Sequence, residues 1–160
     1  MGYFIEHECP SGADYHNLIR FFSEVSDYFE LTRYNIRPEG YAEDYDQVMA
    51  QLAPYLISKK NTHKNAGNDT RRWHSMTLFR YKLNSTTIRI LKESADSLFE
   101  WGGRDEEDNQ LPEDLTFYQN RKPIFFMVGH EEYAEINLTD EKEIEKFKSL
   151  LGTALKEFDD

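Results

Sequence analysis

The chain has 160 residues and a net charge of −11 at pH 7, from 19 Lys and Arg against 30 Asp and Glu. This length suits one domain with one core, and 11 Phe, 10 Tyr and 2 Trp side chains predict an interior rich in aromatic packing. The negative charge repels phosphate backbones and anionic membranes, so general nucleic-acid binding is disfavoured. The single cysteine, Cys9, excludes an internal disulfide and a four-thiolate zinc site.

No apolar run has the length of a membrane span, and the opening "MGYFIEHECP" carries two acids within its first eight residues, unlike a signal peptide. We therefore expect a cytoplasmic protein that does not enter a membrane.

The first third of the chain predicts a strand, a helix, a second strand and a second helix. Residues 3–8 alternate weakly and predict a short strand. Apolar side chains three or four positions apart predict a helix over 13–29 and another over 41–53, which should end or kink at Pro54. The stretch 30–36 between them is interpreted as a strand.

Positive charge gathers in the stretch "SKKNTHKNAGNDTRR", residues 58–72. It contains five Lys and Arg against one acid and a single apolar side chain, Ala66, so we expect a long, mobile, basic connection. With Trp73 and His74 beside it, this stretch has the cations and the stacking ring that nucleic-acid binding uses. The charge of the remaining chain opposes that function, and a surface loop is the favoured interpretation.

The second half predicts a strand over 73–83, a helix over 84–101 and a final helix from Asp140, with Glu143 in the capping-box position. Between these helices, three apolar runs separated by "QNRK" and "GHEE" predict a three-stranded antiparallel meander over 115–118, 123–128 and 133–138. The predicted fold class is α+β: one domain over residues 1–160, with an antiparallel sheet covered by about four helices.

The stretch "GHEE" is the most chemical-looking part of the sequence. His130 with Glu131 and Glu132 could act as acid and base or hold a divalent metal, and on an extended chain His130 and Glu132 would share a face. The alternative is a wet hairpin turn, which is the favoured interpretation because glycine and polar residues collect at such tips.

Two other candidate sites are weaker. His7 and Cys9 are two residues apart and could offer two zinc ligands, with His16 or a carboxylate as a third, but nothing completes the set, so we expect no metal and no cofactor. Trp101, at the end of a predicted helix, is either a core residue or an exposed anchor for a partner. The acidic run over 104–114 lacks the spacing of a calcium loop and is interpreted as a solvated loop, which could face a basic partner.

The stretches "MGYFIEHECPSGADY", "SLFEW" and "LPEDLTFYQNRKPIFFMVGHEEYAEI" resemble small, soluble, uncharacterised proteins of spore-forming bacteria, some of which are labelled stage III sporulation protein AH. The resemblance would cover most of the chain and implies no activity and no catalytic residues. The last stretch also looks like that of toxin-immunity domains, which are often small and acidic, and this second likeness is at the level of the fold.

From these observations we expect a non-enzymatic interaction domain, immunity-like or regulatory, that docks an acidic surface on a protein partner of basic character. Trp101, His130 and Glu132 are its candidate binding residues. The alternative is a small hydrolase or metal-dependent enzyme that uses His130 and Glu132, with Glu131 as a possible third group.

Overall fold

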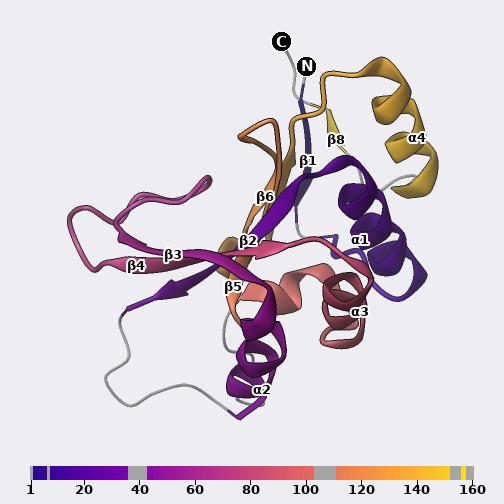
Figure 1. Cartoon of the computed structure of the whole chain (residues 1–160). Coiled ribbons are helices and arrows are strands. Elements are labelled where there is room, and N and C mark those ends of the chain that lie inside the picture. Colours follow the sequence, from indigo (N-terminus) through magenta and orange to yellow (C-terminus); the bar gives the residue numbers. More distant parts are fainter. Residues whose placement is uncertain (1, 7, 36–42, 103–110, 152–155, 158–160) are drawn as a thin grey trace.

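The computed structural model describes residues 2–6, 8–35, 43–102, 111–151 and 156–157, and Figure 1 shows a twisted antiparallel sheet with helices packed against it. The eight strands lie in the order β3-β4-β2-β5-β6-β7-β1-β8, and every neighbouring pair is antiparallel. The strands are β1 (Tyr3–Glu6), β2 (Tyr28–Tyr34), β3 (Leu56–Thr62), β4 (Met76–Lys82), β5 (Glu113–Gln119), β6 (Lys122–Val128), β7 (Tyr133–Ile136) and β8 (Lys156–Glu157). The predicted α+β class is confirmed.

Four α-helices and three short 3-10 helices complete the described structure. They are α1 (Ala13–Val25), α2 (Glu43–Leu52), α3 (Ser85–Glu93), α4 (Glu141–Leu151), η1 (Ala53–Tyr55), η2 (Leu98–Gly102) and η3 (Gly129–Glu131). Helix α1 contacts α3 on one side and α4 on the other. Within the described residues, no helix is long and apolar enough to cross a membrane.

The core lies between the helices and one face of the sheet, and aromatic rings dominate it. Phe22 of α1 packs on Phe117 of β5 and Phe125 of β6, with ring centroids 5.7 and 5.0 Å apart, and Phe147 of α4 lies 5.3 Å from Phe22. In the strand register Phe29 pairs with Phe117, which pairs with Phe125. Because side chains alternate along a strand, these residues all face the helices, and their strand neighbours face the other way.

Helix boundaries follow capping more closely than apolar spacing. Helix α3 begins after Asn84, whose side chain accepts the Thr87 backbone N–H at 2.9 Å while the Asn84 N–H donates to the Thr87 hydroxyl at 3.0 Å. Helix α4 begins after Asp140, as predicted, and the Asp140 carboxylate accepts the Glu143 N–H at 3.0 Å. The helix expected over 84–101 is wrong in its second half, because α3 ends at Glu93 and a separate 3-10 helix, η2, follows.

The basic stretch does not have the structure expected of it. Residues 56–62 form strand β3 at the edge of the sheet, so the first part of the stretch 58–72, predicted as a long mobile connection, is a strand. Residues 56–61 are all exposed, and β3 is held by pairing with β4 rather than by burial of its side chains. Figure 1 shows β3, β4 and the segment that joins them extending away from the helices.

Candidate functional site

The GHEE stretch forms η3 between β6 and β7, with Glu132 in the left-handed backbone region at φ 50°. The side chains of His130 and Glu131 are 51% and 66% exposed, and His130 Nε2 lies 4.0 Å from Glu131 Oε1. In the described part of the chain, no three His, Cys, Asp or Glu side chains are grouped so that they could hold a metal ion. The geometry that would favour the hydrolase alternative, three such groups converging in a cleft, is therefore not found at His130 and Glu132 among these residues.

Trp101 lies in the core and is not an exposed anchor. Its exposed fraction is 0%, and its indole N–H donates to the Tyr15 hydroxyl at 2.8 Å. The Tyr15 hydroxyl donates in turn to the Leu91 carbonyl oxygen, so the ring joins η2 to α1 and α3. Of the two interpretations of Trp101, its complete burial agrees with a core residue and not with an exposed anchor.

The remaining sequence candidates contribute less. His7 and residues 104–110 lie outside the described residues. Cys9 is half-buried, and its sulfur accepts the Phe99 backbone N–H at 3.3 Å.

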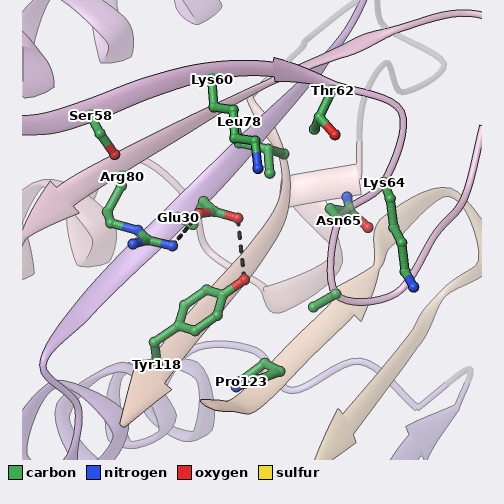
Figure 2. A pocket seen from close by; sticks show the side chains of 11 residues that line it. Glu30, Ser58, Lys60, Thr62, Lys64, Asn65, Leu78, Arg80, Tyr118 and Pro123 are labelled. Atoms are coloured by element: carbon green, nitrogen blue, oxygen red, sulfur yellow. Dashed lines mark hydrogen bonds and ion pairs between the residues drawn. The ribbon is translucent and has the colours of Figure 1, made fainter. Parts of the chain in front are cut away.

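A different site lies on the sheet face that the helices leave uncovered. It is a pocket of about 550 Å³ between β2, β3, β4, β5, β6 and the segment after β3, shown in Figure 2. This volume is in the range of pockets that hold small ligands or a few side chains of a partner. Its polar lining consists of Glu30, Ser58, Lys60, Thr62, Lys64, Asn65, Arg80 and Tyr118. We call it the basic pocket.

A buried carboxylate lies at the floor of the basic pocket. Glu30 of β2 is 4% exposed and contacts Arg80 of β4, with Oε2 3.3 Å from a guanidinium nitrogen, while the Tyr118 hydroxyl donates to Oε1 at 3.3 Å. Figure 2 shows Glu30 between these two partners. The Arg80 guanidinium also lies over the Tyr28 ring, 4.1 Å from its centroid. It lies over the Tyr118 ring as well, 5.3 Å from its centroid, so Arg80 is held in place by one charge and two aromatic rings.

Burial raises the pKa of Glu30 above its ordinary value, and the charge and hydrogen bond of Arg80 and the hydrogen bond of Tyr118 offset part of this rise. Burial also raises the pKa of the Tyr118 hydroxyl, which stays protonated and able to donate at neutral pH. At the floor of the pocket, the negative charge of Glu30 is therefore balanced by Arg80 and by the Tyr118 hydrogen bond. Lys60 and Lys64 add positive charge to the pocket that Glu30 does not balance.

The raised pKa of Glu30 makes a prediction about stability. A folded pKa above the unfolded one means that the folded chain binds the proton more tightly, so this contribution is present at low pH and is lost as pH rises through the folded pKa. We expect the free energy of unfolding of the wild type, relative to Glu30→Gln, to fall as pH rises above the ordinary glutamate pKa of 4.5, by at most about 1.4 kcal/mol per pH unit. Urea unfolding of both proteins at several pH values checks this. A difference that is constant or rises with pH would contradict it.

A second buried carboxylate holds the segment that forms the pocket's rim. Asp114, 1% exposed, accepts hydrogen bonds from the Tyr34 hydroxyl, from the Asn65 side-chain amide at 3.1 Å and from the Gly129 N–H at 2.9 Å. Burial raises the pKa of Asp114, and these donors offset part of the rise. The Asn65 side-chain oxygen Oδ1 accepts the Asn68 N–H at 2.8 Å, which closes a tight turn over the sheet. Asp114 therefore fixes the residues beside Lys64.

Charge is distributed unevenly between the pocket region and the rest of the molecule. Residues 56–82 carry seven Lys and Arg and one Asp, which is a net charge of +6. Because the whole chain has a net charge of −11, the remaining residues carry −17. The pocket follows this division, because its described lining residues include three cations and one acid, Glu30, which Arg80 already pairs. An anionic group is therefore the ligand that this pocket favours electrostatically.

Comparison of the chain with models of protein families, with curated proteins and with solved structures finds no match. The resemblance to the proteins of spore-forming bacteria and to toxin-immunity domains stays a prediction. Function has to be argued from the site's own chemistry.

Sequence reasoning singled out none of the pocket residues as a site, although part of the signal was visible. Residues 58–72 have a basic composition, and Lys60 and Lys64 belong to this stretch. Glu30 gives a weaker signal: on a strand it shares a face with Thr32 and Tyr34, so the polar side of β2 could have been recognised.

Proposed function

We propose that this chain is a non-catalytic interaction domain that binds a carboxylate-bearing segment of a protein partner in the basic pocket. The observation that carries the proposal is the lining: Lys60, Lys64 and Arg80 face one hollow, and the only acid among its described lining residues, Glu30, is already paired. A carboxylate of the partner would replace water around Lys60 and Lys64 and would form charge-assisted hydrogen bonds with their amines.

The proposal places an acidic group of the partner in the pocket, whereas the sequence suggested an acidic face that meets a basic partner. Both contacts can form at once, because this chain carries regions of opposite charge. The acidic segment of the partner would face the pocket, and basic residues of the partner would face the acidic surface of this chain. Electrostatic steering of this kind raises the association rate and weakens as salt rises.

The acidic-face mode has its own support at the opposite end of the sheet. Glu135 of β7 and Glu6 of β1 lie on the helix-free face beside Tyr133, whose hydroxyl donates to the Glu135 carboxylate at 2.7 Å. The rings of Tyr133 and Phe4 have centroids 6.0 Å apart, so this face combines the acids with aromatic rings of the kind that are enriched at protein interfaces. This is the second candidate function, and it predicts a basic partner segment.

A pair of charge reversals tests the pocket. Lys60 lines it, whereas the neighbouring Lys59 lies on the other face of β3, with its amine 5.4 Å from the centroid of the Phe79 ring. Lys60→Glu and Lys59→Glu therefore change the net charge equally and differ only in the face they alter. We expect Lys60→Glu to weaken binding of fluorescently labelled hexaglutamate roughly tenfold or more, and Lys59→Glu less than threefold.

Fluorescence anisotropy at low and at physiological salt measures both affinities. Equal losses in the two variants would reduce the effect to net charge and would overturn the pocket as the site. Tight binding of hexalysine instead, lost on Glu135→Lys, would favour the second candidate.

A further inference from the structure

Strand β3 has an open edge beside the basic pocket. It is the outermost strand of the sheet, pairs with β4 on one side, and has no other strand partner within the described residues. It is seven residues long, and Leu56 and Ile57 at its start are 39% and 49% exposed. An exposed edge of this length offers a row of backbone donors and acceptors to another extended chain.

The side chains of β3 divide cleanly between the two faces of the sheet. Ser58, Lys60 and Thr62 line the basic pocket, and Lys59 between them lies against Phe79 on the face toward the helices. A strand added beside β3 would have the same alternation, so every second side chain of it would lie next to the pocket. The side chains that suit this position are carboxylates, because Lys60 and Lys64 border it.

We infer that β3 accepts an additional strand from an acidic partner, with carboxylates at every second position entering the basic pocket. This inference rests on the proposed function and adds the backbone geometry of the partner. Backbone hydrogen bonds along the edge supply affinity in such strand addition, and the pocket supplies specificity. The exposed Leu56 and Ile57 would pack against apolar side chains near one end of the added strand.

Charge decides between an acidic partner and a second copy of this chain. Pairing β3 of two copies edge to edge would bring Lys59 and Lys60 of both copies together, and lysines on an edge strand are a known barrier to such association. A strand with carboxylates at alternate positions turns the same lysines into attractive contacts.

The experiment uses a capped eight-residue peptide of alternating Glu and Val, and two N-methylated versions of it. In one version every Glu carries a backbone N-methyl group, and in the other every Val does. With the Glu side chains over the pocket and the added strand antiparallel to β3, as every strand pair of this sheet is, only one of these two sets of N–H groups can point toward β3. We expect one methylated peptide to bind at least tenfold more weakly than the parent peptide and the other to bind within threefold of it.

Amide hydrogen exchange locates the contact. Among residues 56–62, exchange of the amides that point away from β4 should slow at least tenfold when the parent peptide binds, and Lys60→Glu, unlike Lys59→Glu, should abolish this protection.

The alternatives give different outcomes. If both methylated peptides bind alike and Lys60→Glu still abolishes binding, strand addition is overturned and the proposed pocket function stands. If neither the peptide nor hexaglutamate binds, the proposed function fails as well. A dimer of this chain that forms through β3, seen by sedimentation and dissociated by the parent peptide, would assign the edge to a second copy and would overturn the acidic partner.

Discussion

Replacement of Gly129 by alanine is expected to lower the free energy of unfolding by about 3 kcal/mol. A Cβ atom at Gly129 would lie 2.2 Å from the Gly102 Cα and 2.7 Å from the Trp101 carbonyl oxygen, so two backbone segments, η3 and η2, would have to separate. Separation would also strain the hydrogen bond from the Gly129 N–H to Asp114. The glycine that looked like a hairpin residue is thus required for a close backbone contact.

Gly67→Ala provides the control for Gly129→Ala. A Cβ atom at Gly67 would meet side-chain atoms of Phe126 and Val128 at 2.9 Å, and side chains can turn aside more cheaply than backbone can. We expect Gly67→Ala to cost less than half as much in urea unfolding. A Gly129→Ala protein within about 0.5 kcal/mol of the wild type would show that the contact between η2 and η3 is not tight in solution.

Replacement of Asp114 by alanine is expected to destabilise the fold by roughly 2–4 kcal/mol. The change removes the carboxylate that accepts three hydrogen bonds. The Tyr34 hydroxyl, the Asn65 side-chain amide and the Gly129 N–H each lose this buried acceptor. Because Asn65 and Lys64 also line the pocket, the affinity for hexaglutamate should fall in parallel with stability.

The control for Asp114→Ala is a variant in which an exposed aspartate, rather than a buried one, is replaced by alanine. Its unfolding and binding are measured in the same way. Asp46 of α2 is exposed, and Asp46→Ala is expected to change stability by less than about 0.5 kcal/mol and to leave the affinity within twofold. If Asp114→Ala loses stability but keeps full affinity, the Asp114 hydrogen bonds do not hold the pocket's rim in place.

Helices and core strands could be predicted because their burial leaves a period in the sequence. The apolar positions of α1, including Leu18, Ile19 and Phe22, recur at helical spacing, and all three are buried. Asp140 could be recognised as the cap of α4 for a similar reason, since the capping pattern is local.

The sequence of strand β3 and of the basic pocket shows no such periodic spacing of apolar residues. The side chains of residues 56–61 are exposed, so no apolar alternation marks them, and the strand forms because β4 offers a backbone partner. The pocket joins residues from β2, β4 and β5 that are up to 88 positions apart, as Glu30 and Tyr118 are. Their meeting depends on strand order and register, which local pattern does not encode.

Nuclear magnetic resonance would test the central claim most directly, by mapping where hexaglutamate binds on the ¹⁵N-labelled protein. The account predicts saturable shifts that are largest for the amides of residues 58–66 and 78–80, around the basic pocket. Shifts centred on β1 and β7, or spread evenly over all lysines of the described chain, would contradict it.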